Sequence, residues 1–381
     1  MTEYVRLGDV AKLINGRAYS QSELLDSGKY PVLRVGNFFS NSNWYYSDLE
    51  LNPEKYCDNG DLLYAWSASF GAKIWSGGKV IFHYHIWKII LSEKINREYL
   101  YHYLNYQSKR LKDGGHGSSM IHLTKSDMEN HIFPLPHLAE QKRIAAALDK
   151  MSSVIAKRKR QIALLDEAAK SLFVEMFGDP VENPMGWEEV SLSKCLNSIE
   201  NGKSFVCDSE KRKGTAPAVL KLSAATYGYY QPEENKAIIS ESQFIAKAEV
   251  HAGDLLFTRK NTPELVGMCA YVFSTPEKLM MPDLIFRLNT NSHCNKLFLW
   301  MLINHDLFRE KIRCLASGSA KSMSNISKKS LNNLEIPLPP LDLQNLFAAR
   351  IEALEAQRAS CERGLKQMET AFAAMMQEYF E

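Results

Sequence analysis

The sequence has little net charge and lacks the segments that direct proteins into or across membranes. Its 46 Lys and Arg residues nearly balance 44 Asp and Glu residues, leaving a formal charge of +2, which disfavours a protein that coats polyanions through overall charge alone. No apolar run approaches the roughly 18 residues of a membrane helix. The N-terminus MTEYVRLGDV has neither the basic nor the apolar region of a signal peptide. We therefore expect a cytoplasmic protein.

Paired cysteines and metal-ligand spacings are also scarce. The seven cysteines are an odd number without a C-x-x-C pair, which is typical of reduced, buried thiols. Cys294, His293 and Cys314 come nearest to a zinc-binding set, but they lack the ligand spacing of a zinc site. We expect no bound metal.

The motifs of common catalytic sites are missing as well. No G-x-G-x-x-G follows an expected strand, and NGKS at residues 201–204 lacks the upstream glycine of a phosphate-binding loop. The proline- and aromatic-rich tetrapeptides of adenine and cytosine methyltransferases are absent. HYH puts His83 and His85 on one face of an expected strand without a third ligand nearby, and we interpret them as surface or core histidines. We expect no catalytic residue and no cofactor, and hence a binding or scaffolding role.

What the sequence does contain is an internal repeat. FPLPHLAEQKRIAAALDKM at residues 133–151 matches IPLPPLDLQNLFAARIEAL at residues 336–354, and the match extends in both directions without a gap. Further upstream, NGR resembles NGK, YPVLRVG resembles PAVLKLS, and NGDLLYAW resembles AGDLLFTR, each at a shifted offset. The chain is thus two tandem copies of a variable body followed by a constant tail.

Both constant tails predict long helices. Apolar residues recur at alternating steps of four and three, which is the spacing of a coiled-coil seam. The PLP and PLPP segments mark where each body ends, because proline cannot lie inside a helix. We expect the two helices to pack antiparallel with approximate two-fold symmetry; the alternative is that each packs on a partner protein. The residues assigned to the seam or to partner binding are Gln141, Ile144, Leu148 and Leu165, and Gln344, Phe347, Ile351 and Leu365.

The bodies mix strands and helices. Short β-branched and aromatic runs such as GDLLYAW and DLIFRLN alternate with turn signals, and each body then carries an amphipathic helix, NREYLYHYLNYQSKRL or CNKLFLWMLINHDLFREKI. The predicted fold class is α+β: two mixed α/β domains at residues 1–136 and 179–339, joined by long antiparallel coiled-coil helices at residues 137–178 and 340–381.

Taken together, these features resemble the specificity subunit of type I restriction-modification systems. The resemblance rests on V-x-L-G-D-V, G-D-L-L, a G-S loop, P-L-P-x-L-x-x-Q and a long helix ending in aromatics, nearly all written twice. It implies that each body is a target recognition domain for one half of a split duplex DNA sequence. It also implies two adenine methyltransferase subunits and restriction translocase-nuclease subunits as partners, with S-adenosylmethionine, ATP and Mg on those partners.

Candidate DNA-binding residues fall into two sets. Positions with a donor in both copies suit phosphate anchoring, because the two bodies should read different sequences, whereas positions that differ suit base readout. The first set is Arg17, Arg34, Ser118, Ser119 and Lys125, with Lys203, Lys221, Lys321, Ser322 and Lys328. The second set is Trp66 and Ser67, with Arg259 and Lys260. The competing interpretation is a two-domain coiled-coil scaffold that does not bind DNA, which would not explain the paired basic positions.

Overall fold

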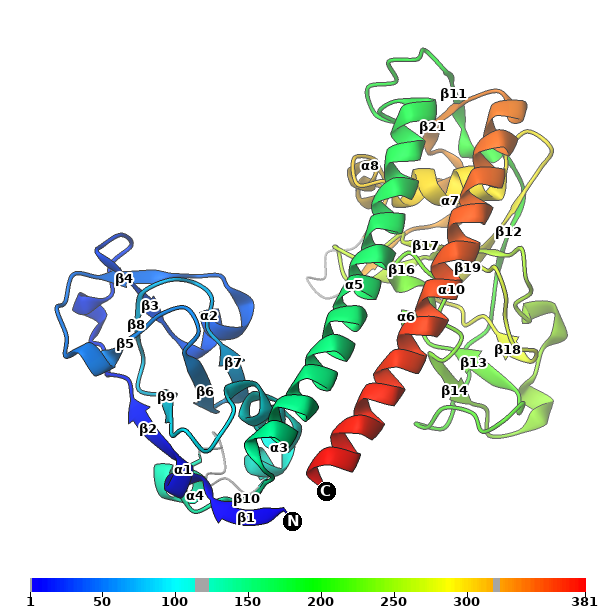
Figure 1. Cartoon of the computed structure of the whole chain (residues 1–381). Coiled ribbons are helices and arrows are strands. Elements are labelled where there is room, and N and C mark those ends of the chain that lie inside the picture. Colours follow the sequence, from blue (N-terminus) through cyan, green and yellow to red (C-terminus); the bar gives the residue numbers. More distant parts are fainter. Residues whose placement is uncertain (1, 114–122, 318–322) are drawn as a thin grey trace. The chain divides into compact units, whose positions relative to one another are not determined.

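The computed structural model describes residues 2–113, 123–317 and 323–381 and divides into two compact units (Figure 1). Unit 1 comprises Met1–Arg160 and Glu362–Glu381, and unit 2 comprises Gln161–Cys361. Each unit combines one body with a segment of each long helix, α5 (Leu138–Phe177) and α10 (Leu341–Phe380). No helix in the described ranges is long and apolar enough to cross a membrane.

In its described residues, the body of unit 1 forms three small sheets and four α-helices. The strands pair in the orders β1-β10, β2-β9-β6-β7 and β4-β3-β8-β5. The elements are β1 (Glu3–Arg6), α1 (Leu7–Val10), β2 (Ala11–Asn15), β3 (Tyr30–Leu33), α2 (Val35–Ser40), β4 (Tyr45–Ser47), β5 (Tyr56–Cys57), β6 (Leu62–Ser67), β7 (Ser69–Ile74), β8 (Val80–Phe82), β9 (Ile86–Leu91), α3 (Arg97–Asp113), α4 (Lys125–Glu129) and β10 (Ile132–Leu135).

The body of unit 2 repeats this topology. Its strands pair in the orders β11-β21, β12-β19-β15-β17 and β14-β13-β18, with an additional β16-β20 pair. The elements are β11 (Glu188–Ser191), β12 (Leu196–Asn201), β13 (Ala218–Leu220), α6 (Ser223–Thr226), β14 (Asn235–Ala237), β15 (Leu255–Thr258), β16 (Lys260–Asn261), β17 (Cys269–Tyr271), β18 (Leu279–Met280), β19 (Ile285–Thr290), α7 (Lys296–Asn304), α8 (Arg309–Cys314), β20 (Ser324–Asn325), α9 (Lys328–Asn332) and β21 (Glu335–Leu338).

The repeated NG dipeptide holds the two sheets of each body together. A Cβ added to Gly16 would lie 2.2 Å from the Phe82 carbonyl oxygen, and one added to Gly202 would lie 1.9 Å from that of Met281. Only glycine allows such close backbone approach. The end of β2 therefore lies against the end of β8, and the end of β12 lies against the residue that follows β18.

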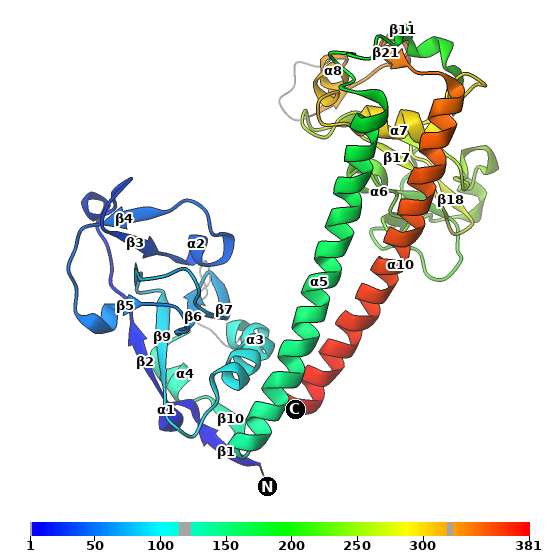
Figure 2. The same cartoon turned by 45° about the horizontal axis from the view of Figure 1, so that its top comes forward.

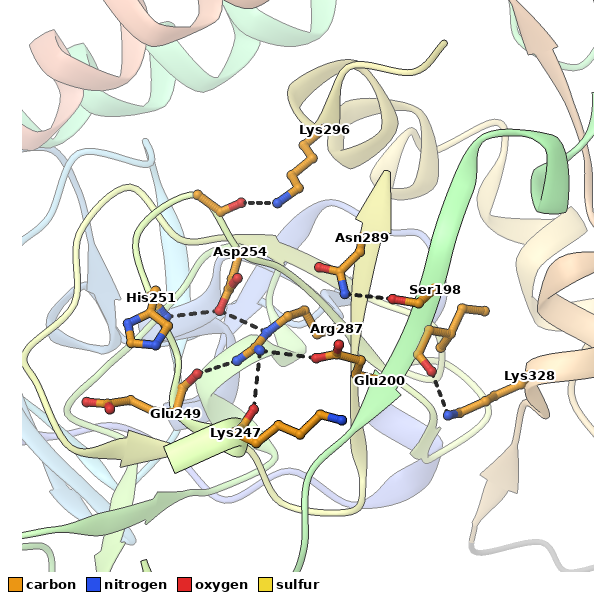
Figure 3. A network of polar contacts seen from close by, with 12 residues as sticks. Ser198, Glu200, Lys247, Glu249, His251, Asp254, Arg287, Asn289, Lys296 and Lys328 are labelled. Atoms are coloured by element: carbon orange, nitrogen blue, oxygen red, sulfur yellow. Dashed lines mark hydrogen bonds and ion pairs between the residues drawn. The ribbon is translucent and has the colours of Figure 1, made fainter. Parts of the chain in front are cut away.

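The repeated GDLL motif supplies a carboxylate that binds a cation on the neighbouring strand. In unit 1 the Lys88 ammonium lies 2.7 Å from Asp61, and in unit 2 the Arg287 guanidinium lies 3.0 Å from Asp254. Arg287 also contacts Glu200 at 3.2 Å and donates to backbone carbonyls of the segment before β15, as Figure 3 shows. Arg287 and Asp254 are both buried, so the motif forms a core ion pair in unit 2, whereas Lys88 and Asp61 are partly exposed.

The amphipathic segment at residues 294–312 forms two helices rather than the single helix that its pattern predicts. Helix α7 ends at His305, whose extended backbone caps it, and α8 begins at Arg309. The His305 ring packs 5.2 Å from the Phe173 ring of α5. The buried Arg309 donates to the Val266 and Gly267 carbonyls. These tertiary contacts break the helix, and no periodicity in the segment signals them.

A buried glutamine joins each long helix to its body. Gln141 accepts from the Asn96 N–H at 2.8 Å and donates to the Lys94 and Pro136 carbonyls at 3.0 and 2.8 Å. Gln344 accepts from the Asn295 N–H at 2.8 Å and donates to two carbonyls at equivalent positions. Both side chains are fully buried. They therefore lie within the joint between helix and body.

Segments of α5 and α10 pack antiparallel within each unit (Figures 1 and 2). In unit 1, Arg143 lies over the Tyr379 ring and Lys159 pairs with Glu369 at 2.8 Å, so residue numbers rise along one helix and fall along the other. In unit 2, Asp166 pairs with Arg358 at 3.0 Å and Phe177 packs 5.0 Å from Phe347. The predicted pair of long antiparallel helices is thus confirmed.

Burial along the helix pair is uneven. Ile144 and Leu148 join the core of unit 1 with Met376 and Phe380, and Phe347 and Ile351 join the core of unit 2. Leu165 and Leu365 are only partly buried, although the four-three spacing predicts that they are as enclosed as the others. Near the middle of the helices, much of the packing surface belongs to long polar side chains such as Arg358.

Candidate nucleic-acid interface

Two cations that the sequence analysis selected in unit 1 come together beyond the carboxyl ends of β3 and β8. These strands pair in parallel, with Leu33 opposite Phe82. Arg34 follows β3, and Arg17, after the NG dipeptide, donates its N–H to the Phe82 carbonyl at 3.0 Å. The His83 N–H donates to the Leu33 carbonyl at 2.8 Å. Residues far apart in the sequence therefore share one edge of the sheet.

A cavity of about 460 Å³ opens at this edge; we call it cavity 1. Its lining is polar and includes Arg34, Asn37, Asn43, His83 and His85. Asn37 is buried and has both side-chain atoms engaged, since it donates to the Val32 carbonyl and accepts from the Arg34 N–H. Asn43 is exposed. Cavity 1 thus offers solvent an amide, imidazoles and a guanidinium.

An aromatic cluster forms the wall beside cavity 1. The rings of His83 and His85 lie 4.8 Å apart, and that of Tyr84 lies 4.4 and 4.0 Å from them. Trp66 meets His85 edge-on at 5.1 Å and stacks on Trp87 at 5.3 Å. Burial, together with His85 and Arg34, lowers the pKa of His83 to about 4, so its imidazole is neutral at pH 7. Neutral imidazole can both donate and accept hydrogen bonds.

The two arginines of this edge are held in place. Arg17 pairs with Glu23 at 2.6 Å and lies over the Tyr19 ring, while Arg34 lies over the Tyr45 ring. Ordered guanidinium groups lose less conformational entropy when they bind a phosphate or a base.

Unit 2 has a counterpart at the ends of β13 and β18, which also pair in parallel. The Lys203 N–H donates to the Met281 carbonyl at 3.2 Å, as Arg17 does to Phe82 in unit 1, and Lys221 follows β13 as Arg34 follows β3. A cavity of about 420 Å³ lies here, and we call it cavity 2. Its lining includes Phe205, Lys221, Ser223, Lys236 and Leu284.

Trp66 and Arg259, which were selected because the residue type differs between the two copies, lie at equivalent points of their bodies. The Trp66 N–H donates to the His85 carbonyl at 3.1 Å, and the Arg259 N–H donates to the Leu284 carbonyl at 3.0 Å. Both residues therefore flank the segment that lines their cavity. Arg259 lies over the Phe286 ring and its guanidinium donates to Asn325.

The remaining candidates are more scattered. Ser67 is 2% exposed and so lies beneath the surface that the others share. Lys260 lies in β16, paired with β20. Lys125 pairs with Glu129 at 3.4 Å in the first turn of α4, and Lys328 donates to the Ile199 carbonyl at 2.6 Å. Four further candidates, Ser118, Ser119, Lys321 and Ser322, lie outside the described residues.

Sequence reasoning missed the importance of the HYH stretch. His83 forms a β-bridge with Arg17 after β8, His85 lies in the turn before β9, and both line cavity 1; they therefore do not share one face of a strand as expected. The signal lay in the repeat, because HYH occupies the place that Pro282–Leu284 occupies in the second copy. Within residues 2–113, 123–317 and 323–381, no three His, Cys, Asp or Glu side chains form a metal-binding group.

Comparison with known proteins places this geometry in a family. The type I restriction modification DNA specificity domain matches residues 2–166 and again residues 184–369. The type I restriction enzyme MjaVIII specificity subunit of Methanocaldococcus jannaschii is 26% identical, covering 93% of this chain and 86% of that protein. The EcoBI specificity subunit of Escherichia coli is 22% identical, covering 97% and 82%.

A solved structure shares the fold. The S subunit of the type I restriction-modification system from M. genitalium aligns with a TM-score of 0.63 at 13% sequence identity, covering 100% of this chain and 96% of that chain. The doubled domain match, the full-length relatives and the shared fold agree with the repeated bodies and paired helices described above. The chain belongs to the type I restriction-modification DNA specificity subunit family and carries two target recognition domains.

Proposed function

We propose that this chain selects the DNA sequence on which a type I restriction-modification complex acts. The body of unit 1 would read one half of a bipartite duplex target and the body of unit 2 the other half. One observation supports the proposal: in both bodies, the cation after the NG dipeptide is bound through its backbone N–H at the end of a parallel strand pair, and the cation after the central strand lines a cavity at that edge.

The chemistry of these edges suits duplex DNA. Lys and Arg at a fixed backbone frame supply the phosphate contacts that set register, while polar side chains that line the cavity beside them can reach base edges. We assign phosphate anchoring to Arg17, Arg34, Lys203 and Lys221. The weak net charge is compatible with this assignment, because the cations are concentrated locally.

The partners would carry out the chemistry. We propose that two adenine methyltransferase subunits and, for cleavage, translocase-nuclease subunits assemble with this chain in the cytoplasm. S-adenosylmethionine, ATP and Mg would bind to those partners, and the isolated chain would be non-catalytic. Methyl transfer by the purified chain alone would contradict this division of labour.

The principal test is the adenine methylation pattern of the host genome, mapped by long-read sequencing with and without this gene. A split motif that appears only with the gene is the expected result. An identical pattern in both strains would refute the proposal and favour the alternative, a two-domain scaffold that does not bind DNA.

Salt dependence provides a second test, on the complex with the methyltransferase subunits. Replacing Arg17 by Gln should reduce the slope of log affinity against log salt by about 0.9, because each phosphate contact releases about that many counterions. Lys12, an exposed cation at the opposite end of the same strand, provides the matched control, and Lys12→Gln should leave the slope unchanged. Equal slopes for both variants would remove Arg17 from the interface.

A further inference from the structure

Cavities 1 and 2 occupy the same position in a duplicated frame. Each lies beyond the carboxyl ends of a parallel strand pair, bounded by the segment that follows the second strand, at residues 83–85 or 282–284. The glycine of the NG dipeptide fixes that segment through backbone contact. The frame is thus set by main-chain atoms, and side chains can change without moving it.

The side chains that line the two cavities differ in hydrogen-bonding character. Cavity 1 exposes the Asn43 amide, which both donates and accepts, beside the His85 ring. Cavity 2 instead presents the ammonium group of Lys236, which only donates, beside the apolar surfaces of Phe205 and Leu284. Lys236 is exposed on β14, and its charge is thus accessible to a ligand.

Base edges in the major groove match these two linings differently. Adenine presents an acceptor next to a donor, which an asparagine amide can bind with two hydrogen bonds. Guanine presents two acceptors, and thymine presents one acceptor with a methyl group. A lysine ammonium next to apolar side chains fits guanine or thymine, because it donates only and offers nothing to the amino groups of adenine and cytosine.

We propose that the two cavities are the points at which the chain selects bases, cavity 1 taking adenine through Asn43 and cavity 2 taking a keto base, guanine or thymine, through Lys236. This inference rests on the proposed function and names the residues that determine specificity within it. The cations after the NG dipeptides and central strands hold the DNA backbone, while the cavity side chains discriminate.

The test compares methylation motifs in cells that express the methyltransferase partner with either wild-type chain or a variant. Asn43→Gly removes the amide without backbone strain, because Asn43 has a φ of 56°, which glycine adopts freely. Lys236→Met removes the ammonium and keeps most of the side chain's length. Lys211→Met is the matched control, since Lys211 is an exposed cation of the same body that pairs with Glu233 and does not line cavity 2.

Asn43→Gly should relax an A·T position in one half-site, and Lys236→Met should relax a position in the other half-site. Each loss of discrimination should be about tenfold to a hundredfold, as for a single side-chain to base contact. Each variant should leave the other half-site unchanged, and Lys211→Met should leave both unchanged.

Failure of this inference can be told apart from failure of the proposed function. A wild-type chain that produces no split motif refutes both. A wild-type split motif that both cavity variants retain in full refutes the inference alone, as does relaxation confined to G·C positions in Asn43→Gly. If Lys236→Met relaxes a position that holds guanine, target DNA with 7-deazaguanine at that position should bind the wild-type complex more weakly and the Lys236→Met complex equally well. Equal weakening for both complexes would refute the assignment of Lys236 to that base.

Discussion

The buried glutamine at the start of each long helix allows a quantitative test of how the bodies are attached. Replacing Gln344 by Met keeps an unbranched side chain of similar length and removes three hydrogen bonds, of 2.8 Å from the Asn295 N–H and of 3.2 and 2.8 Å to the His293 and Pro339 carbonyls. Each bond contributes about 0.5–1.5 kcal/mol net, and the partners left unpaired are largely shielded from water. We expect unit 2 to lose about 3 kcal/mol of unfolding free energy.

The effect should be localised, which hydrogen exchange can detect even if the two units unfold separately. Amides from His293 to the first turn of α7 should lose protection in Gln344→Met, while unit 1 should not change. Asn345→Ala, which removes an exposed contact to the Asn295 side chain, is the control and should cost less than about 0.5 kcal/mol. A comparably small cost for Gln344→Met would refute the assignment of the joint to this glutamine.

Three further perturbations test the frame. Arg287→Met should lower the free energy of unfolding of unit 2 by about 3–5 kcal/mol, measured in urea, because it leaves the buried Asp254 carboxylate without its cation. The double variant Arg287→Met/Asp254→Asn should recover part of this loss. No recovery would contradict the pairing. The pKa of His83 is lowered to about 4, so the contribution of neutral His83 to stability is complete above pH 6.5 and is lost as the pH falls from 6.5 towards 4. Over that range the melting temperature of His83→Gln should fall less than that of wild type. Parallel curves of melting temperature against pH for the two proteins would contradict this. Phe347→Asp should lower the free energy of unfolding by several kcal/mol, measured by thermal unfolding, and Leu365→Asp should lower it much less, because Phe347 is fully buried and Leu365 is half-buried. Equal losses would show that burial at the two positions is alike.

The long helices were predictable because their signal is local and repeated. The four-three spacing after each PLP segment, with prolines to fix the start, gave both helices and their antiparallel pairing. Strands with apolar and aromatic runs, such as β6 and β19, were also expected from the sequence. These features depend on residues close together in the chain, and neighbouring contacts do not override them.

Other features depend on distant contacts and left no such pattern. The break between α7 and α8 follows from the packing of His305 on α5 and from hydrogen bonds of Arg309 to a distant loop. Leu165 and Leu365 are partly exposed although they follow the same four-three spacing as the buried seam residues. Ser67 and Trp66 are adjacent in sequence, yet the strand alternation buries the serine side chain and leaves the indole at the edge.

For the site, the repeat was more informative than any single motif. Arg17, Arg34, Lys203 and Lys221 were selected only because equivalent positions carry a cation in both copies, and the structure brings the two members of each copy to one sheet edge. His83 and His85 escaped because they were weighed only as metal ligands and, without a third ligand nearby, were interpreted as surface or core histidines. Comparison with the second copy, where Pro282–Leu284 replaces them, marks the segment as variable within a fixed frame.

The two copies show why such a frame can persist while its cavities diverge. Gly16 and Gly202 contact main-chain atoms, and any side chain there would collide whatever residues face it. The cation opposite the GDLL carboxylate can change from Lys88 to Arg287, because either pairs with that carboxylate. Asn43 and Lys236 line their cavities as exposed side chains, so their replacement buries no unpaired charge. Substitution of a cavity-lining side chain can therefore alter what the body binds with little loss of stability. A DNA specificity subunit family requires this property, because its members differ in the DNA sequence that they select.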